Sequence, residues 1–162
     1  MELILFLSSG LFMGWSLGAN DAANVFGTAV GTRMVRFRTA ALVCSAFIIL
    51  GAVISGAGAA HTLGRLGAVN ALPGSFTVAL AAGLTTLWMT RLNLPVSTSQ
   101  AVVGAIIGWN FYADTVTDTR SLGSIGSTWV ACPLLAAGVA AGTYMLLRRA
   151  ILYFVERTQE RA

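Results

Sequence analysis

Long apolar runs without a charged side chain constrain this chain more than any other feature. They cover residues 3–20, 39–64, 66–90, 92–113 and 121–147. A helix needs about 20 apolar residues to cross the hydrocarbon core of a bilayer. With 56% hydrophobic and only 10% charged residues, the composition excludes an ordinary soluble domain, which carries about 25% charged residues. We therefore predict an all-α, polytopic integral membrane protein of about five transmembrane segments.

The arginines predict how these segments are oriented. We expect residues 1–162 to form a single transmembrane domain, with 150–162 as a polar cytoplasmic tail. All ten Lys and Arg residues are arginines, and most follow the first, third or fifth segment: Arg33, Arg36, Arg38, Arg91, Arg148, Arg149, Arg157 and Arg161. Cytoplasmic connections carry an excess of basic residues, so the N-terminus is predicted outside and the C-terminus in the cytoplasm of a multi-pass plasma-membrane protein. Because five is an odd number of crossings, a tandem copy of this unit would insert in the opposite orientation. The unit therefore fits one half of an inverted-repeat transporter.

Asp21 is the only acidic residue between Glu2 and Asp114, and its surroundings are apolar. A carboxylate at membrane depth is costly, and it commonly marks an ion or substrate pathway. It belongs to a polar motif that reads Gly18-Ala19-Asn20-Asp21-Ala22-Ala23-Asn24, followed by Gly27-Thr28. Asn and Asp side chains compete with helix backbone hydrogen bonds, so we predict a break in the helix here.

A break at this motif would expose groups that bind ions. Free carbonyl oxygens and the Asp21 carboxylate would suit a cation, and the amides of a helix N-terminus would suit an anion. If the helix continued instead, Asn20, Asn24 and Thr28 would share one face, with Asp21 beside it. The competing interpretation is a polar cluster that only holds helices together.

A second polar motif runs from Asn93 to Gly104 and contains Pro95-Val96-Ser97-Thr98-Ser99-Gln100. Proline favours the first turn of a helix, and Ser97, Thr98 or Ser99 could cap that helix. Neutral hydroxyl and amide groups at such a position suit a tetrahedral oxyanion, or a cation held by hydroxyl oxygens. An ordinary helix cap at the membrane interface is the alternative. We predict a second broken helix here.

Glycine spacing indicates close helix packing. Gly-x-x-x-Gly pairs occur at Gly14/Gly18, Gly27/Gly31, Gly104/Gly108 and Gly138/Gly142, among others, and such pairs let helices approach closely. Apart from Asp21 we find no candidate general base, no metal-ligand cluster and no Ser-His-Asp set. We therefore expect neither an enzyme nor a cofactor.

The two motifs together resemble a known family. Residues 18–31 are closely similar to the signature of the PiT-type inorganic phosphate transporters. Residues 94–100, continuing through 103–108, resemble the second motif of that family, and Trp129 to Leu135 resembles the helix that closes its first repeat. The resemblance implies secondary active transport of orthophosphate with Na⁺ or H⁺ as the coupling ion, in two inverted repeats whose sites meet at the repeat interface.

The same resemblance assigns site residues. It implies a substrate and ion site made of Asn20, Asp21, Asn24, Thr28, Ser97, Thr98, Ser99 and Gln100, with Asp21 and Asn24 as possible Na⁺ ligands. Many family members have His where this chain has Gln100. Glutamine does not titrate, so a proton relay at this position is not expected.

The sequence holds one Asn-Asp signature and one Pro-Ser/Thr motif, whereas family members carry two of each in one chain. A fragment or truncated gene, a split transporter with a separate second-repeat half, or a homo-oligomer, namely an antiparallel homodimer, would each account for this. The arginine bias disfavours the last, because dual topology requires little bias. No nucleic-acid partner is expected.

Other functions also fit the sequence. The chain could be a channel or a structural membrane subunit, with Asp21 lining a pore or pairing with a partner helix. It could also carry another oxyanion such as sulfate. Alternating access with Asp21 as the cation site is the mechanism that we expect.

Overall fold

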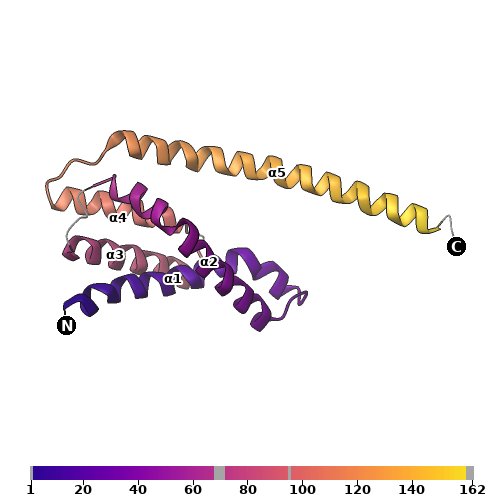
Figure 1. Cartoon of the computed structure of the whole chain (residues 1–162), viewed down its shortest axis with the longest axis horizontal. Coiled ribbons are helices and arrows are strands. Elements are labelled where there is room, and N and C mark those ends of the chain that lie inside the picture. The colour runs from indigo at the N-terminus through magenta and orange to yellow at the C-terminus, as the bar shows by residue number, and fades with distance from the viewer. Residues whose placement is uncertain (1, 68–71, 95, 160–162) are drawn as a thin grey trace. The chain divides into compact units, whose positions relative to one another are not determined.

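The computed structural model describes residues 2–67, 72–94 and 96–159, and within them all regular elements are helices (Figure 1). Helix α1 spans Glu2–Gly31, α2 spans Phe37–Gly64, α3 spans Leu72–Arg91, α4 spans Thr98–Tyr112 and α5 spans Thr119–Gln159. The predicted all-α class is confirmed.

Four of these helices are long and apolar enough to cross a membrane, by length and composition: Leu3–Gly31, Phe37–Gly58, Leu72–Arg91 and Thr119–Tyr153. The protein is therefore a polytopic membrane protein. Helix α4 has 15 residues and is about 22 Å long, which is less than the ~30 Å hydrocarbon core. It is short because the helical backbone begins only at Thr98. Pro95, which we expected in a first helical turn, lies outside the described residues.

The chain divides into two compact units, Met1–Thr119 and Arg120–Ala162. Helix α5 makes up the second unit and is one long ribbon (Figure 1). Pro133 lies inside it and removes one backbone donor from its ladder. Its helical backbone continues to Gln159, so it includes most of the stretch that we predicted as a polar tail.

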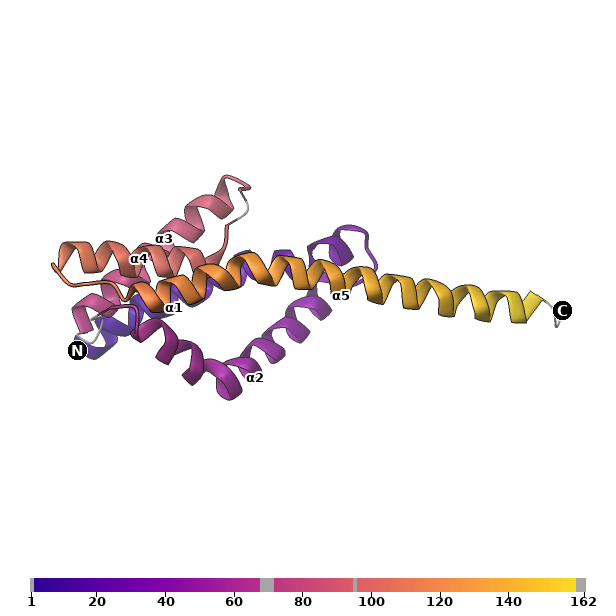
Figure 2. The same ribbon diagram turned by 90° about the horizontal axis from the view of Figure 1, so that it is seen from above.

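In the first unit, α1 and α3 pack side by side and run in the same direction, as both views show (Figures 1 and 2). The rings of Phe6 and Phe76 meet edge to face, with centroids 6.0 Å apart. Further along, the Ser16 hydroxyl donates a hydrogen bond to the Gly83 carbonyl over 3.0 Å. The face of α1 in this contact carries small polar side chains, of which Ser9, Ser16 and Asn20 are buried. Small residues of this kind let two backbones come close in a membrane.

Gly83 lies at the closest approach of α1 and α3. A Cβ atom built on it would lie 2.9 Å from the Phe12 ring and 3.2 Å from the Met13 Cα. Because the Met13 Cα belongs to the backbone, a side chain at this position would force the helices apart.

We expect Gly83→Ala to lower the free energy of unfolding by about 1–3 kcal/mol, the usual cost of overpacking. Gly14→Ala on α1 is the matched control, because no atom lies within 4 Å of its added Cβ. The melting temperatures of both variants are measured by thermal unfolding in detergent. Equal melting temperatures for Gly83→Ala and Gly14→Ala would contradict the packing described here.

Helix α4 runs back along α3 in the opposite direction. Gly74, near the start of α3, faces the Trp109 ring near the end of α4, since a Cβ on this glycine would lie 2.9 Å from the ring. The facing surfaces are apolar, and their buried residues include Val78, Ala82, Val102, Val103 and Ile106. Thus α3 is sandwiched between α1 and α4, and the start of α4 lies at the end of α3.

The predicted break in the first helix is wrong, because α1 continues without interruption from Glu2 to Gly31. The Asn20 side chain does not compete with the helix backbone, since its hydrogen bonds go to Asp21, Thr90 and Val96. At the second motif, residues 92–94 and 96–97 are not helical and belong to the connection between α3 and α4, so the described residues show a turn between two helices and not the predicted broken helix. The glycine pairs of α1 and α4 also differ from expectation, since no atom lies within 4 Å of a Cβ on any of them.

Candidate functional site

Asn20 joins three segments at one point in the first unit. It lies about two thirds of the way along α1, and its side chain is only 6% exposed. Its Nδ2 donates to Asp21 Oδ1 over 3.0 Å and to the Val96 carbonyl over 3.2 Å. Its Oδ1 accepts a hydrogen bond from the Thr90 hydroxyl over 3.3 Å. The first motif is therefore tied to both the end of α3 and the segment before α4.

Asp21 is half-buried beside Asn20. Its carboxylate accepts a hydrogen bond from the Asn20 amide, and in the part of the chain that the structure describes no arginine forms an ion pair with it. A carboxylate held by one neutral donor keeps most of its capacity to accept hydrogen bonds or bind a cation. The second carboxylate oxygen is the natural position for such a ligand.

The second motif begins with a tight turn at the end of α3. Asn93 has a φ of 56°, and the Leu94 amide donates to the Met89 carbonyl over 3.0 Å while the Asn93 amide donates to the Thr90 carbonyl over 3.1 Å. This pair of bonds is a Schellman motif, in which asparagine tolerates the left-handed conformation. The turn ends α3 and leads the chain back toward α1.

Helix α4 then starts with the expected cap. Ser97 has extended backbone angles, and its hydroxyl accepts a hydrogen bond from the Gln100 amide over 3.4 Å. This confirms one of the three predicted capping residues. Thr98 is half-buried, and Ser99 and Gln100 are exposed. The amide-rich start of α4, which carries a partial positive charge, thus lies one residue beyond the Val96 carbonyl that Asn20 holds.

The structure brings some of the predicted site residues together and leaves others apart. Asn20 and Asp21 lie next to the residue that precedes Ser97. Asn24 and Thr28 share a face of α1 with Asn20, as expected for a continuous helix, but both are exposed. Within the described residues, neither makes a side-chain hydrogen bond to the second motif. Whether these residues bind a ligand stays a prediction.

Asn20, Asp21, Thr90 and Val96 form a polar cluster. Two of its members, Thr90 and Val96, were not expected from the sequence. Thr90 lies in the apolar run before Arg91, where a threonine carries no signal of its own. Val96 takes part only through its backbone carbonyl, which is independent of side-chain type.

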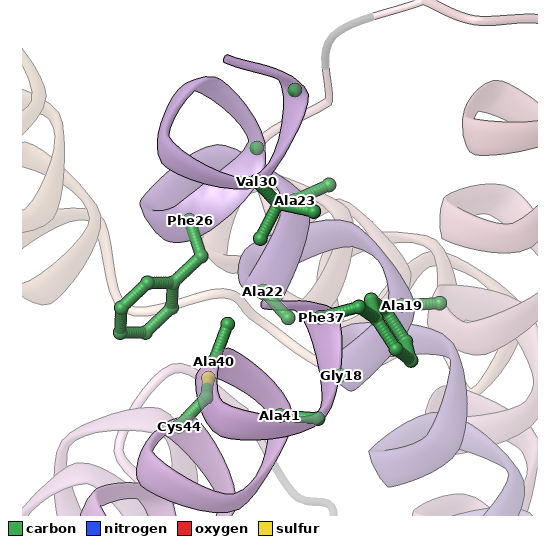
Figure 3. A pocket seen from close by; sticks show the side chains of 12 residues that line it. Gly18, Ala19, Ala22, Ala23, Phe26, Val30, Phe37, Ala40, Ala41 and Cys44 are labelled. Carbon is green, nitrogen blue, oxygen red and sulfur yellow. The ribbon is translucent and has the colours of Figure 1, made fainter. Parts of the chain in front are cut away.

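A cavity of about 470 Å³ lies on another face of α1, against the start of α2. Figure 3 shows that its labelled side chains consist of carbon, apart from the sulfur of Cys44. Asn20, Asp21, Asn24 and Thr28 do not line it, because they lie on the opposite face of the same helix. A lining without polar groups does not fit an oxyanion or a metal ion. The candidate site is therefore the polar cluster and not this cavity.

The polar cluster and the start of α4 combine a group that can bind a cation with groups that can bind an anion. The Asp21 carboxylate can bind a cation, and the hydroxyls and amides at the start of α4 can donate hydrogen bonds to an anion. A protein side chain, Asn20, connects the two. This arrangement can hold a cation and an anion in neighbouring positions without an arginine.

Comparison with known proteins agrees with the sequence resemblance. The model of the phosphate transporter family matches residues 17–162. Proteins that carry the name "putative phosphate permease" are similar to most of the chain. The Mycobacterium bovis protein is 31% identical over 98% of this chain, the Chlamydia trachomatis protein 30% over 93% and the Pyrococcus abyssi protein 31% over 93%.

The matched part of these relatives is limited. The chain spans 32%, 38% and 40% of their respective lengths. No solved structure matches the chain.

Proposed function

The chain belongs to the phosphate transporter family, and from this premise we propose that it takes part in cation-coupled transport of inorganic phosphate across a membrane. The proposed mode is symport by alternating access, with Na⁺ or H⁺ as the coupling ion. The proposed location is the plasma membrane, with the N-terminus outside and the C-terminus in the cytoplasm. The relatives' names support phosphate as the substrate.

One observation carries this proposal. The Asn20 amide nitrogen lies 3.0 Å from Asp21 Oδ1 and 3.2 Å from the Val96 carbonyl. A carboxylate within an apolar helix is thereby placed beside the start of another helix. Helix N-termini favour anions, and isolated carboxylates in membranes favour cations. The two charges of a symported pair thus have complementary positions in one cluster.

The order of binding follows from charge. Asp21 alone would repel phosphate from the start of α4. A cation on the free Asp21 oxygen, or a proton, removes that repulsion and completes a site that attracts the anion. Ser97, Thr98, Ser99 and Gln100 then supply hydroxyl and amide groups to the phosphate oxygens. Because the cluster holds no arginine, phosphate can also leave when the site opens to the other side.

Part of the site is open in this chain. Asn24 and Thr28 are exposed and Asp21 is half-buried, although polar groups at membrane depth are normally covered by protein or face water. We propose that a second repeat covers this face of α1, either as a separate half or as a further part of a longer chain. An inverted copy would bring a second set of the same motifs to the same place.

Substrate selectivity tests the proposed function. Hydrogen phosphate can donate a hydrogen bond to Asp21 or Gln100, whereas sulfate has no proton to donate at neutral pH. We expect saturable uptake of labelled phosphate into proteoliposomes that contain the protein in its native full-length or oligomeric form. A hundredfold excess of sulfate should leave this uptake unchanged. Inhibition by sulfate as strong as that by unlabelled phosphate would overturn the assignment of phosphate as substrate.

A further inference from the structure

The Asn20 carboxamide is almost fully used by protein groups. Both donors and the acceptor of this side chain have partners, namely Asp21 Oδ1, the Val96 carbonyl and the Thr90 hydroxyl. With 6% of its surface exposed, the amide has little room for a ligand. Its position suggests that it arranges the site and does not itself hold phosphate.

The chemistry of the three partners fixes the orientation of this amide. The Asp21 carboxylate and the Val96 carbonyl can only accept hydrogen bonds, so the amide nitrogen must face them. The amide oxygen then faces Thr90, whose hydroxyl is the group able to donate to it. Rotation of the amide by 180° would place three acceptor oxygens together, which is unfavourable.

We propose that Thr90 is a positioning residue of the transport site, an inference that rests on the proposed function. Its hydroxyl holds the Asn20 amide in the orientation that bridges Asp21 and the Val96 carbonyl. Its own carbonyl accepts the Asn93 amide over 3.1 Å, so the same residue also anchors the turn that ends α3. Thr90 thereby keeps the carboxylate and the start of α4 at a fixed spacing.

The Asn20 amide connects the Asp21 carboxylate to the start of α4. A single nitrogen atom, Asn20 Nδ2, serves both the carboxylate and the backbone one residue before Ser97. A cation that draws Asp21 Oδ1 away from this nitrogen also changes the bond that restrains Val96. Without the Thr90 hydroxyl, the amide oxygen loses its partner and the amide is held only through its nitrogen, so the link between cation binding and the position of α4 is weakened.

The test compares three threonine substitutions on α3. Thr90→Val removes the hydroxyl and keeps the shape of the side chain, and Thr90→Ser retains the hydroxyl. Thr85→Val is the matched control, because the exposed Thr85 hydroxyl donates only to the Ala81 carbonyl of its own helix, over 2.9 Å. Two quantities are measured in each variant: the side-chain amide resonances of Asn20 by ¹⁵N NMR, and the cation concentration for half-maximal phosphate uptake.

We expect Thr90→Val to shift or broaden the Asn20 resonances and to raise the half-maximal cation concentration about three- to tenfold, as for the loss of one hydrogen bond. Thr90→Ser and Thr85→Val should match the unaltered protein in both measurements. Unchanged Asn20 resonances, or an unchanged cation concentration, in a folded Thr90→Val protein would overturn the proposal.

The NMR measurement keeps this inference separate from the proposed function. If the unaltered protein does not transport phosphate, the proposed function fails, and the Asn20 resonances alone decide whether Thr90 positions the amide. A shift in Thr90→Val with restoration in Thr90→Ser supports the positioning role in that case, and unchanged resonances overturn it.

Discussion

Asp21→Asn is expected to abolish cation-coupled phosphate uptake while the protein remains folded and inserted. The substitution keeps the size of the side chain and removes the charge that would hold the cation. Contacts to a charged group are worth about 1.5–3 kcal/mol, so cation affinity should fall by about one to two orders of magnitude. The half-buried position of Asp21 and its single neutral partner, Asn20, give the carboxylate no other evident role in the described residues.

Asp114→Asn is the matched control for this prediction. Asp114 is exposed after α4 and has a φ of 51°, a conformation that asparagine tolerates as well as aspartate. The same chemical change there should leave uptake intact. Normal coupled uptake by Asp21→Asn, measured with radiolabelled phosphate at equal protein density, would remove Asp21 from the mechanism.

Asn110→Ala is expected to cause the largest loss of stability among single polar substitutions in the first unit. Asn110 is 1% exposed. Its Nδ2 donates to the Leu66 carbonyl over 3.1 Å and to the Thr117 hydroxyl over 2.9 Å, and its Oδ1 accepts from the Thr115 hydroxyl over 3.3 Å. It thus joins the end of α4 to the segment after α2 and to the segment before α5.

Removing this side chain empties a buried position and removes three hydrogen bonds, and each such bond contributes about 0.5–1.5 kcal/mol. We expect the free energy of unfolding to fall by about 2–4 kcal/mol, because water can satisfy part of the loss. Asn24→Ala is the control, since Asn24 is exposed on α1 and should unfold like the unaltered protein. Denaturant or thermal unfolding in detergent would refute the prediction if Asn110→Ala and Asn24→Ala were equally stable.

Gly67 provides an independent check on the same contact. A Cβ atom on Gly67 would clash with the Asn110 side chain. Gly67→Ala should therefore destabilise the protein alone, and less so when Asn110 is already alanine, because the two residues share one contact.

The sequence predicted the fold class and the positions of both motifs because the signals are local. Charge-free runs mark helices directly, and Ser97 after a proline motif is a recognisable cap. The expected break at Asn20 and Asp21 was wrong for a reason that lies outside local sequence. The competing side-chain bonds of Asn20 are made with residues about seventy positions away, at Thr90 and Val96.

The close contacts between helices could not be predicted from the sequence either. The Gly-x-x-x-Gly pairs were the visible packing signal, yet Gly74 and Gly83 lie at the contacts that bring α3 against its neighbours. Which glycine meets a neighbour depends on helix register, and register follows from tertiary packing. Asn110 offered a weak signal, as a polar residue inside the charge-free run 92–113, but its partners could not be predicted from one sequence.

Phosphate uptake under separately imposed cation gradients is the measurement that shows whether phosphate transport is coupled to a cation at Asp21. Proteoliposomes containing the protein in its native full-length or oligomeric form would be given an inward Na⁺ gradient, an inward H⁺ gradient or neither. We expect one of the two gradients to drive phosphate accumulation above equilibrium, and Asp21→Asn to abolish this accumulation. Phosphate that only equilibrates under every gradient, at the same rate in Asp21→Asn, would contradict this expectation.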